Sequence, residues 1–195
     1  MPVVPERPAE WPAFGNAVTR CLGRTVLQIA GWRMIGQLPT HKKLIMAVAP
    51  HTSNWDFFVG LFALFGIGAR LHWIGKHTIF RWPVRGLLLR LGGIPVNRTL
   101  AQSTVEQTVD RFRQEKALIV VMTPEGTRRK VDKLKTGFLR IAAGARIPIL
   151  LVGFDYAKKE ICLGELFHPS NDLAADEKMV RDYFRQFTGK YPELY

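Results

Sequence analysis

Short apolar runs alternate with segments of helical periodicity along most of this chain, and no other feature of the sequence restricts its fold as strongly. The runs cover positions 43–49, 70–76, 92–98, 117–123 and 147–155. Strands that alternate with helices form βαβ units, in which the strands pair in parallel and the helices cover the sheet. The alternation therefore predicts an α/β fold: a single layered domain with a largely parallel central sheet flanked by helices.

Apolar residues recur at helical spacing between and after these runs. Helices are predicted at 54–68, from Pro83 to about Leu91, around Val105, Val109 and Phe112, around Phe138, Ile141, Ala142 and Ala145, and around Val180, Tyr183, Phe184 and Phe187. Ser53 or Asn54 is able to cap the first of them, because short polar side chains accept hydrogen bonds from the free amides at a helix start.

The N-terminal segment, residues 14–32, predicts a further, amphipathic helix. Six residues fall near one face of this helix, with Arg20 and Arg24 among them along the chain. The six are Phe14, Val18, Cys21, Leu22, Thr25 and Ile29. Two interpretations stay open. The helix packs on the core, or it lies as an interfacial helix on anionic lipid, flanked by Trp11 and Trp32.

Length and charge limit the class of the protein. A chain of 195 residues suits one domain, 1–195, which we divide into an N-terminal amphipathic or interfacial segment (1–42) and an α/β core (43–195). There are 28 Lys and Arg against 16 Asp and Glu, a formal net charge of +12. Such a surface favours anionic partners: nucleic acid, acidic lipid headgroups, phosphorylated substrates or an acidic carrier protein. The basic residues are spread along the chain without a recognition motif, so no specific nucleic-acid binding is expected.

The sequence gives no sign of export or of a membrane-spanning helix. The start, MPVVPERPAEW, lacks the basic and apolar regions of a signal peptide. The longest charge-free apolar run, 57–69, has 13 residues, short of the roughly 18 that a spanning helix requires. Cys21 and Cys162 have no CxxC spacing, which argues against a disulfide framework and a zinc knuckle and favours a reducing compartment. We therefore expect a cytoplasmic protein that attaches peripherally to a membrane surface.

Polar clusters follow three of the predicted strands. PHTSNWD spans 50–56, VNR spans 96–98, and PEGTRRK spans 124–130. Open α/β sheets bind ligands outside the carboxyl ends of their strands. We therefore expect these clusters to meet at one edge of the sheet and to form one site.

His51 and Asp56 are the candidate catalytic pair. If a helix begins near Ser53, Asp56 lies in its first turn and can accept a hydrogen bond from His51 Nδ1–H. Nε2 is then free to act as a base, which is the base-and-orienter part of a catalytic triad. The alternative is that Asp56 caps the helix and His51 is a loop residue.

The sequence offers no convincing nucleophile for this base to activate. None of Ser53, Ser103 and Ser170 lies in a GxSxG motif, and Cys162 is distant along the chain. The economical hypothesis is that the substrate supplies its own hydroxyl. General-base assistance of this kind contributes about 10²–10⁴-fold to a rate.

The segment TPEGTRRKVDKLKTG, residues 123–137, is the candidate binding segment. Gly126 allows a tight turn, and Thr127 with nearby amides can bind phosphate oxygens, with Arg128 as a bidentate clamp. Glu125 can hold a substrate hydroxyl or orient Arg128, and Arg98 can supply a second phosphate contact. The alternative is a solvated basic turn, in which the lysines of this segment are surface charges: Lys130, Lys133 and Lys135.

Neither a metal site nor a cofactor site is expected. No recognised ligand spacing joins His51, His72, His77 and Asp56, and neither GxxxxGK[ST] nor GxGxxG is present.

In their order and spacing these clusters resemble the motifs of the 1-acylglycerol-3-phosphate acyltransferase family, from about Leu44 to Gly153. PHTSNWD resembles NHxxxxD, GGIPVNR resembles a motif that ends in Arg, TPEGTRRK resembles FPEGTRS, and IPILLVGF resembles a VPIxPV-like strand. The resemblance assigns His51 and Asp56 to catalysis. It assigns five residues to acceptor binding: Arg98, Glu125, Gly126, Thr127 and Arg128. Pro50, Thr123 and Arg129 depart from the family pattern, which bears on the identity of the acceptor.

The resemblance implies a reaction and its partners. Acyl-CoA or acyl carrier protein donates a fatty acyl thioester as co-substrate, without a further cofactor, to a lysolipid acceptor at an anionic membrane surface. His51 removes the proton from the acceptor hydroxyl, which attacks the thioester carbonyl without an acyl-enzyme. The alternatives are an acyltransferase for a different lysolipid or a lipid-linked polar alcohol, and a catalytically silent lipid-binding relative.

Overall fold

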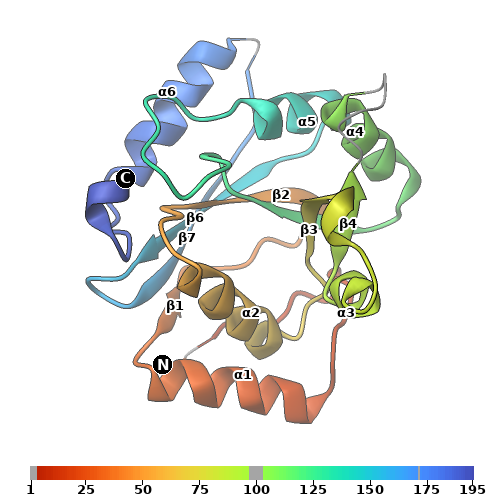
Figure 1. The fold of residues 1–195 in the computed structure, drawn as a ribbon, viewed down its shortest axis with the longest axis vertical. Helices are drawn as coiled ribbons and strands as arrows, with labels where there is room; N and C mark the ends of the chain where they lie inside the picture. The colour runs from red at the N-terminus through yellow and green to blue at the C-terminus, as the bar shows by residue number, and fades with distance from the viewer. Residues whose placement is uncertain (1–3, 97–102, 171) are drawn as a thin grey trace.

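The computed structural model of the chain describes residues 4–96, 103–170 and 172–195, and these form one sheet with helices on both faces (Figure 1). The seven strands of the described residues are β1 (Arg33–Ile35), β2 (Lys43–Ala49), β3 (His72–Lys76), β4 (Gly93–Val96), β5 (Leu118–Met122), β6 (Ile149–Asp155) and β7 (Glu160–Phe167). Their order across the sheet is β1-β7-β6-β2-β5-β3-β4. All neighbouring pairs are parallel except β6 and β7, which confirms the predicted largely parallel sheet.

β2 lies in the middle of the sheet and directs alternate side chains to its two faces. Ile45 is paired with Val120 of β5 on one side and with Ile149 of β6 on the other. Leu44 and Met46 enter one hydrophobic cluster, while Ile45 enters the other. A parallel strand covered on both faces needs an almost continuous apolar sequence, and KLIMAVA provides it.

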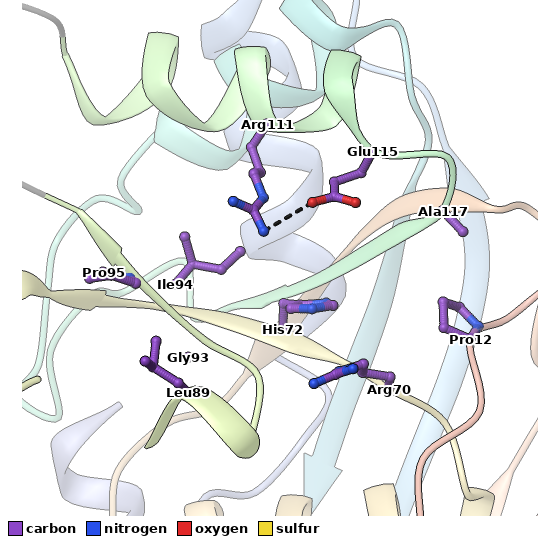
Figure 2. Close-up of a pocket in the computed structure, with 10 residues that line it drawn as sticks. All are labelled: Pro12, Arg70, His72, Leu89, Gly93, Ile94, Pro95, Arg111, Glu115 and Ala117. Atoms are coloured by element: carbon purple, nitrogen blue, oxygen red, sulfur yellow. Dashed lines mark ion pairs between the residues drawn. The ribbon is translucent and has the colours of Figure 1, made fainter. Parts of the chain in front are cut away.

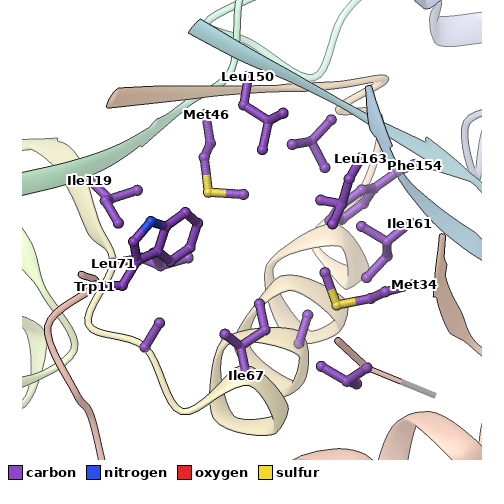
Figure 3. Close-up of a cluster of buried hydrophobic side chains, with 14 of the residues drawn as sticks. Trp11, Met34, Met46, Ile67, Leu71, Ile119, Leu150, Phe154, Ile161 and Leu163 are labelled. Atoms are coloured by element: carbon purple, nitrogen blue, oxygen red, sulfur yellow. The ribbon is translucent and has the colours of Figure 1, made fainter. Parts of the chain in front are cut away.

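The helices of the described residues divide between the two faces of the sheet (Figure 1). They are α1 (Ala17–Ile29), α2 (Trp55–Ile67), α3 (Arg85–Arg90), α4 (Thr104–Gln114), α5 (Gly137–Ala145) and α6 (Leu173–Phe184), with 3₁₀ turns η1 (His77–Ile79) and η2 (Pro192–Leu194). Ile67 of α2 packs with Met46 and Leu150 on one face (Figure 3). The helices α4, α5 and α6 cover the other face, where Phe138 and Val180 are fully buried.

α1 packs inward through Gly23 and Leu27 and not through the apolar stripe that the sequence shows. A Cβ on the buried Gly23 would lie 2.4 Å from the backbone nitrogen of Gly66, so the two helices cross at close range. Val18 and Ile29 are consequently turned outward, with 74% and 82% of their surface exposed. The helix packs on the core through Gly23 and Leu27, as one interpretation has it, but the apolar stripe forms its outer face. Among the described residues, no helix has the length and hydropathy needed to cross a membrane.

β1 and β7 are not predicted by the sequence patterns. β7 follows β6 after a short turn and runs back antiparallel to it, and β1 pairs with β7 in parallel. They extend the sheet on the side away from β3 and β4, beyond the strands that carry the polar clusters.

Candidate functional site

The loop between β2 and α2 brings His51 and Asp56 together. His51 Nδ1 lies 3.0 Å from Asp56 Oδ2, and the backbone N–H of Ser53 donates to the same oxygen at 2.9 Å. Ser53 Oγ in turn accepts from the Trp55 amide, whereas Asn54 makes no capping bond through its side chain. The predicted contact is therefore present, and Asp56 both fixes the helix start and orients the imidazole.

Tyr156, directly after β6, binds the other oxygen of Asp56. Its hydroxyl donates to Asp56 Oδ1 at 2.6 Å. The ring meets Trp32 edge-on at 4.8 Å between centroids, and the Tyr156 amide donates to the carbonyl of Thr188. Burial opposes ionisation of Asp56, but the hydrogen bonds from His51, Tyr156 and Ser53 outweigh it and hold its pKa below the ordinary value. Asp56 therefore stays a carboxylate with both oxygens occupied.

Glu125 joins the loop after β5 to the loop after β2. Its Oε1 accepts the backbone N–H of His51 at 3.0 Å, while Oε2 is buried without a hydrogen-bond partner. Burial raises the pKa of Glu125 to about 7, although the bond from the His51 amide opposes that shift. Glu125 is only 3% exposed. It therefore fixes the backbone of His51 from a buried position, and its Oε2 remains able to accept a hydrogen bond.

Arg128 lies on the Nε2 side of His51. Its Nε is 3.4 Å from His51 Nε2, a long contact in which the arginine donates and the imidazole accepts. The partners of His51 therefore define its tautomer, with the proton on Nδ1 toward Asp56 and a lone pair on Nε2. This is the state that a general base requires.

The other predicted binding residues lie in the turn that delivers Arg128, or outside the described residues. Gly126 adopts a φ of +63°, a conformation that favours glycine, and its amide donates to the carbonyl of Thr123. Thr127 is half-buried in the same turn. Arg98 falls outside the residues that the structure describes.

A basic cavity of about 340 Å³ opens beside His51. Glu125, Val131, Asp132, Leu134 and Leu194 line it together with residues that the sequence patterns did not assign to the site: Arg129, Lys130, Arg181, Arg185 and Tyr195. Arg181 lies on α6 and Arg185 directly follows it. No local motif links them to His51, because the fold brings them there across more than half of the chain.

A second, larger cavity of about 580 Å³ lies at the opposite end of the sheet (Figure 2). It surrounds His72 at the start of β3, and an ion pair of 2.9 Å joins Arg111 to Glu115 at its side. Burial lowers the pKa of His72, and the charge of Arg70 lowers it further. Nδ1 of His72 is buried without a partner, so no carboxylate orients this imidazole.

The geometry around His51 suits proton removal from a bound hydroxyl, since an imidazole oriented by Asp56 faces a cavity with basic walls. No group of three or more His, Cys, Asp and Glu side chains suited to hold a metal ion occurs in the part of the chain that the structure describes.

Two of three comparisons relate the chain to known proteins. The acyltransferase family model matches residues 33–155. The crystal structure of the 1-acyl-sn-glycerophosphate (LPA) acyltransferase PlsC from Thermotoga maritima has a similar fold, with a TM-score of 0.62 and 18% sequence identity over 87% of this chain and 76% of that chain. Comparison with curated protein sequences gives no match. The matched residues 33–155 include His51, Asp56 and Glu125.

Proposed function

Because the chain belongs to the acyltransferase family, we propose that it transfers a fatty acyl group from a thioester to a hydroxyl of a lysophospholipid such as 1-acylglycerol-3-phosphate. The donor is acyl-CoA or acyl carrier protein. The observation that carries the proposal is the contact of 3.0 Å between His51 Nδ1 and Asp56 Oδ2, beside a cavity with basic walls. The PlsC structure, whose title names an LPA acyltransferase, supports the choice of acceptor.

The reaction needs one base and no enzyme nucleophile. The acceptor hydroxyl donates to His51 Nε2, and the imidazole takes its proton as the oxygen attacks the thioester carbonyl. A carbon–oxygen bond forms and a tetrahedral oxyanion results. When this intermediate collapses, the carbon–sulfur bond breaks and the thiolate leaves, taking the proton from the imidazolium. Asp56 stabilises the imidazolium while it exists.

Arg128 has a defined role in this reaction. In the structure its guanidinium occupies the Nε2 side of His51, where the acceptor hydroxyl must arrive. A phosphate group attracts a guanidinium more strongly than a neutral imidazole does, because the pairing is bidentate and charge-assisted. Binding of an anionic acceptor therefore draws Arg128 away and frees the base, with Arg98 as a second phosphate contact.

Exposed apolar side chains on two helices can contact acyl chains and a membrane surface. Trp55, Phe57 and Phe58 begin α2 next to Asp56, are about half exposed, and contact one another through their rings. Val18 and Ile29 project outward from α1. With the net charge of +12, these surfaces support peripheral attachment to an anionic membrane surface on its cytoplasmic side.

The proposal is tested by supplying the purified protein with acyl-CoA or acyl carrier protein thioesters and a panel of acceptors. The panel contains lysophosphatidate, other lysophospholipids and lipid-linked alcohols, and mass spectrometry identifies the products. We expect acylated lysophosphatidate with one free thiol released per ester formed. Incubation with thioester alone should leave the intact mass of the protein unchanged, because no acyl-enzyme forms.

Two results would redirect the proposal. A product from another acceptor in the panel, without acylation of lysophosphatidate, would assign the same chemistry to that acceptor. Binding of the protein to lipid vesicles without any product would favour the catalytically silent lipid-binding relative.

A further inference from the structure

Three buried polar atoms without a hydrogen-bond partner converge on one place. They are Glu125 Oε2, Arg181 Nε and Tyr195 Oη, and all three residues line the cavity beside His51. Buried polar atoms in folded proteins are nearly always paired with protein or solvent groups. Three unpaired atoms from three separate segments around one cavity therefore indicate a site built for a polar ligand.

Tyr195 also interacts electrostatically with two charged residues of the cavity lining, Glu125 and Arg185. Burial raises the pKa of the Tyr195 phenol, the Glu125 carboxyl raises it further, and Arg185 opposes both. Tyr195, Glu125 and Arg185 therefore face a shared space. Glu125, at 3% exposure, is the most deeply buried of them.

The charge of the lining selects an anion. Four basic residues line the cavity against two acidic ones, Glu125 and Asp132. The basic residues are Arg129, Lys130, Arg181 and Arg185. Arg181 is held in place, since it donates to the carbonyl of Asp132 at 3.1 Å and lies 3.6 Å from Glu177. Arg185 is exposed and has one surface partner, Asp182, at 3.0 Å. A contact of this kind is weak in water, so Arg185 can turn toward a bound anion.

The volume of the cavity limits the size of the ligand. At about 340 Å³ it lies at the lower end of the range of small-molecule sites, about 300–1,000 Å³. A polar headgroup fits such a space, whereas a lipid with its acyl chain does not. The chain of an acceptor must therefore remain outside, and the exposed aromatic side chains Trp55, Phe57 and Phe58 lie at the start of the neighbouring helix.

We propose that Arg181, Arg185 and Tyr195 form, with Glu125, a subsite for the anionic headgroup of the acceptor. The inference rests on the proposed function and extends it from the loops after β2 and β5 to α6 and the C-terminal segment. Arg185 and Tyr195 contact the phosphate group of the headgroup. Glu125 Oε2 accepts a hydrogen bond from an acceptor hydroxyl, which places that part of the headgroup beside His51. Arg181 donates its unpaired Nε–H to the same headgroup, while its bond to the carbonyl of Asp132 holds it in place.

The test compares Arg185→Ala and Tyr195→Phe with the wild-type protein on two acceptors, lysophosphatidate and the uncharged monoacylglycerol. We expect each substitution to raise the KM for lysophosphatidate about tenfold, as removal of one charge-assisted hydrogen bond does. The KM for the thioester and the activity with monoacylglycerol should stay unchanged. Isothermal calorimetry with glycerol 3-phosphate as the probe should show the same loss of affinity.

Arg113→Ala is the matched control. Arg113 is an exposed helical arginine with an aspartate three residues before it, Asp110 at 3.4 Å, as Arg185 has Asp182, and it does not line the cavity. Its replacement should leave every KM at the wild-type value. An equal rise in KM for Arg113→Ala would overturn the subsite, because loss of surface charge alone would then explain the effect.

Three further results would overturn the inference, and one of them separates it from the proposed function. If Arg185→Ala and Tyr195→Phe keep the wild-type KM for lysophosphatidate, the subsite is wrong while acyl transfer stands. If they raise the KM for acyl-CoA alone, the cavity binds phosphates of the donor. If wild-type protein acylates neither acceptor, the proposed function fails first and the subsite with it.

Discussion

Two cavities formed by the described residues lie at opposite ends of the same sheet, and a histidine lines each of them. The larger one, about 580 Å³, surrounds His72 where β3 begins. The smaller one, about 340 Å³, includes His51 where β2 has ended. Size therefore does not mark the candidate site. The difference lies in the partners that each histidine has.

The backbone N–H and both ring nitrogens of His51 have partners, whereas one ring nitrogen of His72 has none. The backbone N–H of His51 binds Glu125, its Nδ1 binds Asp56, and its Nε2 faces Arg128. Nδ1 of His72 is buried without a partner, and the nearby Arg70 opposes its protonation. An imidazole becomes a useful base when a carboxylate fixes its tautomer, and this arrangement is found at the carboxyl end of the sheet.

Matched replacement of the two histidines gives the largest expected effect. His51→Ala should lower kcat for acyl transfer by about 10²–10⁴-fold, because a general base contributes about that much. His72→Ala should leave kcat within about twofold of the wild-type value, since residues far from the chemistry act independently of it. Steady-state kinetics with lysophosphatidate, corrected for the folded fraction of each variant, measures both. Equal losses in the two variants would remove the distinction between the two ends of the sheet.

Tyr156→Phe should have the next largest effect and would sharpen the comparison. The variant keeps the ring against Trp32 and removes the donor to Asp56 Oδ1, so kcat should fall about 10- to 100-fold, the value of one charge-assisted hydrogen bond. Asp56 should also bind a proton more readily, because one of the bonds that lower its pKa is gone. The titration profile of Asp56, followed by carbon NMR of its carboxyl group, should therefore move to higher pH.

Tyr183→Phe is the control for this substitution. Tyr183 is also half-buried, packs on Phe184 and Phe187, and lies away from Asp56. It should keep the wild-type profile. A fall in kcat for Tyr156→Phe without a shift in the titration of Asp56 would reduce Tyr156 to a structural role. A double-mutant cycle with Asp56→Asn checks the pairing, since coupled residues give effects that do not add.

Glu125→Gln should have a smaller effect, on stability. The pKa of Glu125 is raised from 4.5 to about 7 in the folded protein, so between these values the folded state holds a proton that the unfolded state has lost. The wild-type protein therefore loses stability as pH rises through this window, and the variant does not. Urea unfolding at pH 5 and pH 8 should show the variant gaining about 1–2 kcal/mol relative to wild type at pH 8. Asp56, whose pKa is lowered, contributes to pH dependence only in more acidic solution.

An unchanged difference between Glu125→Gln and wild type at the two pH values would contradict the account of Glu125 as a buried group that resists ionisation. His72→Gln, at the other end of the sheet, is the comparison variant for this measurement. Burial lowers the pKa of its imidazole, so the contribution of His72 to stability grows as pH rises toward the unfolded value, opposite in sign to that of Glu125.

A strand or helix was predictable from the sequence where its own burial determines its hydrophobic pattern. KLIMAVA is apolar at nearly every position because β2 is buried on both faces, and it appears as a strand over residues 43–49, as expected. β7 was harder to predict, because EICLGELF mixes a glycine and two glutamates with apolar residues. Its alternation of Ile161 and Leu163 with less buried neighbours was the available signal. The outward stripe of α1 depends on the crossing at Gly23, which only the partner helix determines.

The candidate site was predictable to the extent that it lies in contiguous segments. His51, Asp56 and Glu125 occur in two short clusters after β2 and β5, and the rule for parallel sheets brings those clusters together. Tyr156 and Arg185 have no local signature. Tyr156 belongs to the site because its hydroxyl donates to Asp56, 100 positions earlier in the chain. A contact of that kind exists only once the sheet has formed.

Chemical rescue tests the central claim, that His51 is the base, most directly. The His51 side chain is 20% exposed and lines the cavity, so its removal in His51→Ala leaves room for a free imidazole. Acyl transfer by this variant should rise in proportion to added imidazole, and among substituted imidazoles it should rise with their basicity. A folded His51→Ala protein that binds lysophosphatidate and gains no activity from any imidazole, or that is fully active without one, would contradict the account.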